Sequence, residues 1–521
     1  MNRIFEFIMI LAVAGLLPVS CMDNRPYYEF TNPVIKGDIP DPSVISYEGS
    51  YYAVGTSSEW APFYPMFVSD DLVNWEQYGH VFDEKPQWTM SSFWAPELFC
   101  LDGKVYCYYT ARRASDETSY IGVAVADSIK GKFVDYGPVI EHGSEAIDAF
   151  VFDDGGQLYV SWKAYGLDDR PIEIVASRLS DDGLSLEGDP FTLLVDEGGV
   201  GIEGQCHVRI GDWYYIIYAA RGCCGPGSDY EVRVARAGSF EGPYEYCPAN
   251  PILHGGDGDF MSCGHGTLVA ADDGRMFYLC HAYLKGEGFY QGRQPVLHEI
   301  ECGEDGWLRF KGGNIAAKKQ IMPVRGVPQE SSEAFIDEFY EERPSVKWSW
   351  NYPYSDVTAV NVNGNLMLSG THAGDDVYGS AFCLRPESSS YFIETELRAC
   401  GASVAGLTFY GDDDNLAAFG QNDGKLSLNM MKDGVETVLF ETQLPDYPIY
   451  LKAEVRSGCF AGFLYSADGS RWTSATVEPV DLSPIVRWDR VFRPGLITDA
   501  QNGTPSKFGY FIMSISSDSG K

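Results

Sequence analysis

The chain has 521 residues, more than one hydrophobic core usually serves, so we expect two or three domains. Its 38 Lys and Arg stand against 74 Asp and Glu, and the formal charge of -36 would repel nucleic-acid phosphates and anionic membrane surfaces, which excludes nucleic acid as a partner class. The 56 Gly, 33 Tyr, 29 Phe and 11 Trp, with short apolar runs, are typical of an all-β protein with many tight turns.

The N-terminal segment is predicted to be a signal peptide. Arg3 precedes the apolar run IMILAVAGLLPV, which is too short for a typical membrane-spanning helix and ends at small residues. The LPVSC ending is similar to a bacterial lipoprotein box, with residues 1–20 as the signal and Cys21 as the lipid-bearing first mature residue. Because Pro18 stands where Leu is common, an ordinary cleavage site is the alternative. We therefore expect an exported protein, in the periplasm or on the outer membrane, whose membrane contact is limited to the lipid anchor.

Twelve cysteines follow Cys21, and none belongs to a CxxC pair or to a Cys/His cluster with zinc spacing. Export permits disulfides, but their connectivity cannot be read from the sequence. The adjacent Cys223 and Cys224, in the segment RGCCGPG, either form a vicinal disulfide at a loop tip or are two free thiols in a tight turn.

A repeat of roughly fifty residues runs through the first part of the chain. Five aromatic strands follow glycine turns, in EGSYYAVG, DGKVYCYYT, DGGQLYVSW, GDWYYIIYAA and DGRMFYLCHA. Each is preceded by a short segment with one conspicuous residue, and the five are Asp41, Trp94, Asp148, Glu203 and His265, at intervals of 53, 54, 55 and 62. Third and fourth strands follow in each unit, which predicts a five-bladed β-propeller over residues 28–325. Since the first strand of each blade lines the axis, these residues should converge on one funnel.

Three of these residues are acids, whereas most acids in such a chain are merely solvated. If Asp41, Asp148 and Glu203 share a partly buried pocket, at least one carboxyl pKa is raised, as a general acid requires. Two carboxylates suffice to hydrolyse a glycosidic bond, and a third can position the acid and tune its pKa. A divalent cation held by the three acids is the alternative.

The motifs IPDPSV, YEGSYYAVGTSS, FWAPEL, AIDAFVFDD, IEGQCHVRIGDWYYIIYAA and CGHGTLV, in this order, resemble glycoside hydrolase family 43. The resemblance runs from about Asp38 to Phe310. It implies a five-bladed enzyme that acts on xylose- and arabinose-containing plant glycans and inverts the anomeric centre. It also implies that Asp41 is the general base that activates water, Glu203 the general acid, and Asp148 the residue that orients the acid and adjusts its pKa.

The same resemblance implies roles for four further residues. Trp94 would be an aromatic platform beside the sugar, with a blade-packing tryptophan as the alternative. Glu97 would be a structural hydrogen-bonding residue. Arg293, in the GRQP segment, would reach the sugar hydroxyls, with a surface salt bridge as the alternative. His265 would meet a calcium or sodium ion near the axis through water, with a satisfied core histidine as the alternative, and the chemistry itself would require no cofactor.

The second half begins after a polar linker at residues 326–339. Alternating apolar and polar positions with turns at NG, DG and ADGS predict an antiparallel β-sandwich over residues 335–518. It resembles the concanavalin-like domain of xylosidase-type members, from which a loop can narrow the active-site mouth. The competing hypothesis is a carbohydrate-binding module with its own groove, which would need exposed aromatics such as Trp348, Trp350 or Trp472.

The leading functional hypothesis is an exo-glycosidase that releases terminal β-D-xylosyl or α-L-arabinofuranosyl residues from xylan, arabinoxylan or arabinan. The alternatives are a catalytically inactive surface glycan-binding lipoprotein and a scaffold propeller for protein partners. Invertase-like and fructan-hydrolysing propellers are disfavoured, because their WMNDPNG-like opening and RDP triplet are replaced here by IPDPSV and AIDAF. Galactofuranose as the terminal sugar, the linkage and the oligomeric state are left open.

Overall fold

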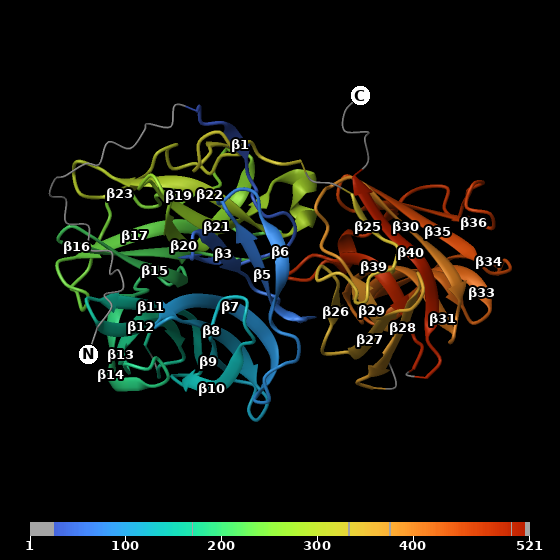
Figure 1. Cartoon of the computed structure of the whole chain (residues 1–521), viewed down its shortest axis with the longest axis horizontal. Coiled ribbons are helices and arrows are strands. Elements are labelled where there is room, and N and C mark those ends of the chain that lie inside the picture. Colours follow the sequence, from blue (N-terminus) through green and yellow to red (C-terminus); the bar gives the residue numbers. More distant parts are fainter. Residues whose placement is uncertain (1–24, 169, 332–333, 375–376, 502, 516–521) are drawn as a thin grey trace.

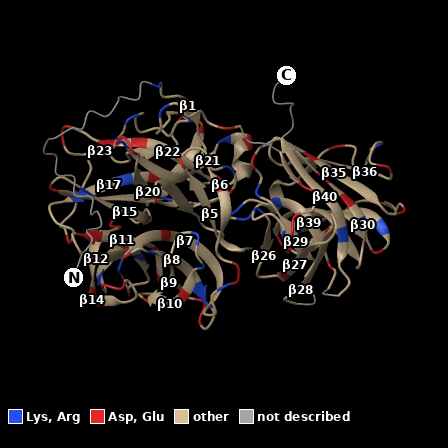
Figure 2. Ribbon diagram, viewed as in Figure 1, with Lys and Arg blue, Asp and Glu red and all other residues tan. Residues whose placement is uncertain are grey.

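The computed structural model describes residues 25–168, 170–331, 334–374, 377–501 and 503–515. The predicted signal peptide and Cys21 lie outside the described residues. The chain forms two lobes side by side, a ring of sheets from the N-terminal part and a pair of stacked sheets from the C-terminal part (Figure 1). Acidic residues are spread over both lobes (Figure 2). No helix within the described residues is both long and apolar enough to cross a bilayer.

The N-terminal lobe consists of five antiparallel blades, each with its first strand innermost. Blade 1 contains β2 (Ser43–Tyr47), β3 (Ser50–Val54), β5 (Phe63–Ser69) and β6 (Glu76–Phe82). Blade 2 contains β7 (Thr89–Leu101), β8 (Lys104–Arg113), β9 (Ser119–Ala126) and β10 (Val134–Ile140). Blade 3 contains β11 (Glu145–Asp154), β12 (Gln157–Tyr165), β13 (Glu173–Leu179) and β14 (Leu186–Val195). Blade 4 contains β15 (Ile202–Ile210), β16 (Trp213–Ala220), β17 (Glu231–Ala237), β18 (Glu245–Tyr246) and β19 (Leu253–His254), and blade 5 contains β20 (Phe260–Ala270), β21 (Met276–Leu284), β22 (Arg293–Cys302) and β23 (Leu308–Phe310).

A separate apolar core fills the space between each pair of neighbouring blades, which explains why the second strands are nearly continuous aromatic and aliphatic runs. In β8 the side chains alternate between two cores. Tyr106 and Tyr108 pack toward blade 3, whereas Cys107 and Tyr109 pack toward blade 1. A strand buried on both faces cannot show the polar alternation of a half-exposed sheet.

The ring closes between blade 1 and blade 5. Val44 and Tyr51 of blade 1 share a core with Phe277 and Leu297 of blade 5, and the inner strand β20 lies beside β2. The N-terminal strand β1 (Glu29–Thr31) also pairs with β24 (Lys319–Ile321) after the last blade. The predicted five-bladed propeller is therefore confirmed, and its two chain ends meet at one seam.

The C-terminal lobe is a sandwich of two antiparallel sheets around one large core. One sheet contains β27 (Ser355–Asn361), β28 (Leu366–His372), β40 (Ser506–Ile515), β30 (Tyr391–Ala399), β35 (Ile449–Arg456), β36 (Phe460–Ser466) and β37 (Thr473–Ser474), with β25 (Phe335–Asp337) and β38 (Val480–Asp481) at its sides. The other contains β34 (Val435–Gln443), β33 (Lys425–Lys432), β32 (Asn415–Asn422), β31 (Val404–Asp412), β39 (Arg493–Thr498), β29 (Ser380–Cys383), β26 (Ser349–Asn351) and β4 (Trp60–Ala61). Short 3-10 helices, η1 (Gly286–Gln291) and η2 (Ser483–Ile485), complete the described elements. The predicted sandwich is confirmed.

The two lobes share a sheet, which the sequence did not predict. Strand β4 belongs to blade 1 by sequence but forms the last strand of a sandwich sheet, where Ala61 pairs with Trp350 of β26. Trp60 is 1% exposed and packs edge-on against Tyr410 of the sandwich. A two-residue strand has no periodicity to read, so its partner could not be inferred from the sequence.

A cavity of about 390 Å³ also lies between the lobes. Phe67 and Trp75 line it from blade 1, and Arg385 and Tyr391 line it from the sandwich. It contains none of the residues predicted for the active site.

Candidate active site

The inner end of each blade carries one residue with a left-handed backbone. The five residues are Asp41, Ala95, Asp148, Gly204 and His265, with φ of 54, 43, 61, 59 and 45°. In β7, β11, β15 and β20 this residue lies at a break in the register with the second strand. Such bulges re-aim side chains, here within the strands that line the axis. Trp94 and Glu203 stand one residue before the equivalent position. The repeat is therefore more regular in its backbone conformation than in the type of residue at each position.

The carboxylate of Asp41 is held by neighbours from blades 1 and 5. Its Oδ2 accepts a 2.7 Å hydrogen bond from the Thr56 hydroxyl, and its backbone N–H donates to Nδ1 of His281 at 3.1 Å. Burial alone would raise the pKa of Asp41, but nearby His265 and Arg293 outweigh burial and hold this pKa well below its usual range. The ionised form of Asp41 is therefore favoured.

Asp148 has the opposite electrostatic balance. Its Oδ2 accepts the backbone N–H of Gly204 at 3.0 Å, and its own N–H donates to the Thr110 hydroxyl at 3.2 Å. Burial raises the pKa of Asp148, and the neighbouring Glu203 carboxylate adds to this increase. His265 and Lys163 lower the same pKa but do not offset the combined increase. A proton bound to this acid pair is thus favoured on Asp148.

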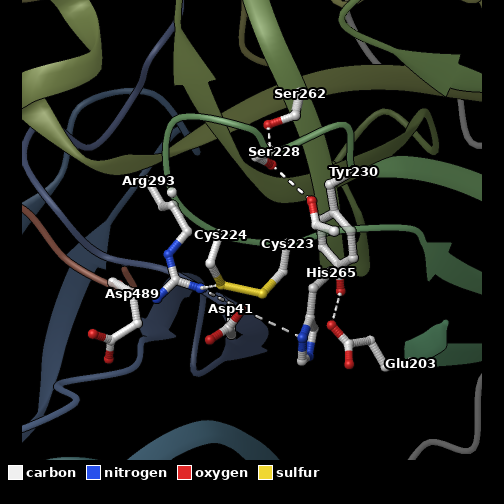
Figure 3. Close-up of a disulfide and its surroundings, with 12 residues drawn as sticks. Asp41, Glu203, Cys223, Cys224, Ser228, Tyr230, Ser262, His265, Arg293 and Asp489 are labelled. Carbon is white, nitrogen blue, oxygen red and sulfur yellow. Dashed lines mark hydrogen bonds and ion pairs between the residues drawn. A yellow bond between two sulfur atoms is a disulfide. The ribbon is translucent and has the colours of Figure 1, made fainter. Parts of the chain in front are cut away.

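Glu203 is paired with a cation that was not predicted from the sequence. Its Oε2 lies 2.7 Å from Nζ of Lys163, and its Oε1 accepts a 2.8 Å hydrogen bond from the Tyr230 hydroxyl (Figure 3). Burial would raise the pKa of Glu203, but the charge and hydrogen bond of Lys163, with the Tyr230 hydrogen bond, lower it. The sequence predicted that crowding of the three carboxylates raises the pKa of at least one of them. This increase is present for Asp148 but not for Glu203.

His265 bridges the acids. Its Nδ1 lies 3.4 Å from Oδ1 of Asp41 and 3.9 Å from Oδ2 of Asp148, so carboxylates from blades 1 and 3 face one imidazole from blade 5. Among the described residues no three His, Cys, Asp or Glu side chains are arranged to hold a metal ion directly. A water-mediated ion beside His265 stays a prediction.

Arg293 is 4% exposed and is therefore not in a surface salt bridge. One guanidinium nitrogen, Nη1, lies 3.9 Å from Oδ1 of Asp41, and Nη2 donates to the backbone carbonyl of Asp489 at 2.8 Å. Asp489 belongs to the sandwich, so a loop of the second lobe reaches the predicted site, as the resemblance implied. The Arg293 backbone N–H donates to Asp38 at 2.9 Å, which fixes the strand end that carries the guanidinium.

The two remaining predicted residues differ in burial. Trp94 is half-buried near the middle of β7, which is compatible with both a sugar platform and a packing role. Glu97 is buried and accepts a 2.6 Å hydrogen bond from the hydroxyl of Ser43. It joins blades 1 and 2, in agreement with its predicted structural role.

The site residues that were not predicted from the sequence lie on or beside the second or third strand of a blade. Lys163 is on β12, His281 on β21, Tyr230 directly before β17, and Thr56 just after β3. Their signal was available in part, because Lys163 and His281 are lone ionisable residues in the otherwise apolar runs YVSWKAY and YLCHAY. An unpaired charge in a strand buried on both faces requires a partner, and here the partner is at the axis.

None of the three sandwich tryptophans that were candidates for an independent glycan groove is fully exposed. Trp348 is fully buried, and Trp350 and Trp472 are half-buried. Trp488, next to Asp489 in the loop that reaches the propeller, is 64% exposed.

Comparison with known proteins agrees with this geometry. The model of glycosyl hydrolases family 43 matches residues 30–308, and that of the β-xylosidase C-terminal concanavalin A-like domain matches residues 336–487. A β-xylosidase of Bacillus subtilis is 26% identical over 431 residues, 75% of this chain and 78% of the relative. A non-reducing end α-L-arabinofuranosidase of Bacteroides ovatus is 27% identical over 358 residues, 66% of this chain and 65% of the relative.

The fold itself recurs in solved structures. The crystal structure of a xylan β-1,4-xylosidase from Bacillus halodurans C-125 superposes with a TM-score of 0.80 at 21% identity and covers 93% of this chain and 100% of that chain. The family model covers more than half of the present chain. From this match, together with the ring of blades and the carboxylates at its axis, we conclude that the chain belongs to glycosyl hydrolases family 43 and is a glycoside hydrolase.

Proposed function

We propose that this glycoside hydrolase is an inverting exo-glycosidase that releases terminal β-D-xylosyl or α-L-arabinofuranosyl residues from plant cell-wall glycans. The observation that carries the proposal is the convergence of Asp41, Asp148 and Glu203 around His265. The named activities of the Bacillus and Bacteroides relatives support this substrate class.

Asp41 is proposed to be the general base. A base must be free of its proton before the reaction, and the low pKa of Asp41 satisfies that condition. The hydrogen bond from Thr56 occupies Oδ2, so the other oxygen, Oδ1, faces His265 and the interior of the site. In an inverting reaction this carboxylate would take a proton from the water that attacks the anomeric carbon.

Glu203 is proposed to be the general acid. Its side chain is 18% exposed against 6% for Asp148, so of the two it has the better access to a glycosidic oxygen. Asp148 sets the proton affinity of the pair. When Asp148 is ionised its negative charge favours protonation of Glu203, and Lys163 opposes that protonation.

The proposed setting is extracytoplasmic. The basic start and the apolar run before Cys21 support export and a lipid anchor in the outer membrane. The substrate would then be an oligosaccharide whose terminal sugar is accessible at the cell surface or in the periplasm. Globomycin-sensitive processing with mass-spectrometric identification of a lipidated Cys21 would support the anchor, and an unmodified N-terminus after ordinary cleavage would contradict it.

The purified enzyme should be tested with nitrophenyl β-D-xyloside, nitrophenyl α-L-arabinofuranoside and unmodified xylo- and arabino-oligosaccharides. We expect single sugars as the first products, with NMR detecting the inverted anomer before mutarotation. Retention of configuration or release of longer fragments would contradict the inverting or exo assignment. Glycan binding without any cleavage would instead support the inactive surface lipoprotein.

A further inference from the structure

We propose that a vicinal disulfide, Cys223–Cys224, forms a wall of the sugar-binding site and positions a terminal pentosyl ring by packing against its C–H-bearing face. This inference deepens the proposed function and rests on it. The sequence left two states of the pair open, and the structure contains the bonded state, with Sγ atoms 2.07 Å apart. The other ten described cysteines are free thiols.

The disulfide lies among the predicted site residues. It is on the loop between β16 and β17, and Figure 3 shows it between the guanidinium of Arg293 and the pair formed by Tyr230 and Glu203. Nη1 of Arg293 lies 3.4 Å from Sγ of Cys224, and the same nitrogen lies 3.9 Å from Asp41. Both cysteines are half-buried, so part of their surface faces solvent at the mouth of the site.

The loop that carries the disulfide is held on both sides of it. After the pair, the N–H of Gly225 donates to the Tyr283 hydroxyl at 3.3 Å. Before the pair, the carbonyl of Gly222 accepts a hydrogen bond from Ser228, which in turn lies 2.8 Å from the Ser262 hydroxyl of blade 5. A methyl group on Gly225 would lie 3.1 Å from the carbonyl of Trp488, so the sandwich loop packs directly on this turn.

Global stability does not explain such a bond. A disulfide stabilises a fold mainly by closing a loop in the unfolded chain, and a bond between adjacent residues closes almost none. Its effect is local, because it holds two sulfur atoms together on one surface. Sulfur is polarisable and a weak hydrogen-bond acceptor, so this surface favours dispersion contact with C–H groups over competition for sugar hydroxyls.

The contact with Arg293 adds a polar consequence. Sulfur satisfies a guanidinium N–H only weakly, and the Asp41 oxygen at 3.9 Å is too far for a hydrogen bond. Nη1 therefore retains donor capacity for a sugar hydroxyl, while the disulfide fixes its direction. The disulfide would pack against the C–H-bearing face of the sugar ring, and the guanidinium would donate a hydrogen bond to a hydroxyl of the same ring.

Reduction of the wild-type enzyme tests this role directly. A phosphine transfers two electrons to the disulfide and takes oxygen from water, which leaves two thiols and a phosphine oxide. After a gain of two thiols is verified by mass spectrometry, we expect KM for the preferred nitrophenyl glycoside to rise roughly fivefold or more, with kcat changed less than about twofold and the unfolding midpoint unchanged. An unchanged KM in the reduced enzyme would overturn the proposal.

Two variants complete the test. Cys223→Ser/Cys224→Ser should have the raised KM already and should not respond to the phosphine. The matched control Cys100→Ser, at an exposed free thiol on the outer part of β7, should keep both the wild-type KM and the response. Absence of hydrolysis in the untreated wild type would refute the proposed function itself, whereas active enzyme that is indifferent to reduction would refute only the role of the disulfide.

Discussion

The ammonium group of Lys163 lies 2.7 Å from Oε2 of Glu203, and both side chains are largely buried. Blade 3 thus supplies a cation to the proposed acid of blade 4. The ion pair favours ionised Glu203, while a general acid must carry a proton, so Lys163 limits the pH range over which the protonated form is available.

Replacement of Lys163 by Met should widen that range. Without the cation the pKa values of Glu203 and Asp148 both rise, because Lys163 lowers each of them in the wild type. The basic limb of the kcat/KM profile should therefore move to higher pH by about one unit. The exposed residue Lys104 provides a control, since Lys104→Met should leave the profile in place. A basic limb that stays or moves to lower pH in Lys163→Met would contradict the pairing.

Glu203→Gln should discriminate between leaving groups. Cleavage of unmodified oligosaccharides, whose leaving oxygen needs a proton, should fall by roughly 10³, whereas a dinitrophenyl glycoside should lose about tenfold or less. Asp148→Asn should show the same leaving-group dependence in a weaker form, because it disturbs the acid without removing it. If the stronger dependence appears in Asp148→Asn instead, the two roles must be exchanged. Asp41→Asn should abolish both reactions, since water attack is common to them.

Glu97 should make stability decline with rising pH. Burial raises its pKa from 4.5 to about 8, against a smaller opposing hydrogen bond from Ser43. Because the folded state prefers the protonated acid, its contribution is fully present below pH 4.5 and is lost as the pH rises to about 8. Glu97→Gln, which keeps the shape without the charge, should flatten urea-unfolding free energies between these pH values and add on the order of 3 kcal/mol near neutrality. A slope identical to that of the wild type would show that Glu97 is not the source.

Trp60→Ala should destabilise both lobes together. The indole is buried in the sandwich although its strand comes from blade 1, and truncation of such a side chain costs about 3–5 kcal/mol. Chemical unfolding should therefore shift to lower denaturant concentration for probes in either lobe. Trp488→Ala, at an exposed position, should shift neither. Loss of stability confined to the sandwich would indicate that the lobes unfold independently.

The ring and the three acids could be predicted because each blade repeats the same local signal, an inner segment followed by an aromatic strand. The signs of the pKa shifts could not be predicted, because they depend on how burial balances the charges of His265, Lys163 and Arg293 in the folded site. The vicinal disulfide was one of two states that the segment RGCCGPG allowed, and only its surroundings give it a role. Strand β4 was missed because pairing with Trp350 is set by the docking of the lobes and not by local pattern.

Closure of the propeller between its first and last blades also dictates when activity can arise during synthesis. Asp41 can contact His281 and Arg293 only after some 250 further residues have been synthesised. Trp60 can contact its sandwich neighbours only later still. A nascent polypeptide thus carries Asp41, the proposed general base, for most of translation without the imidazole and guanidinium that lower its pKa. Hydrolytic competence therefore arises late in synthesis, after blade 5 has closed on blade 1.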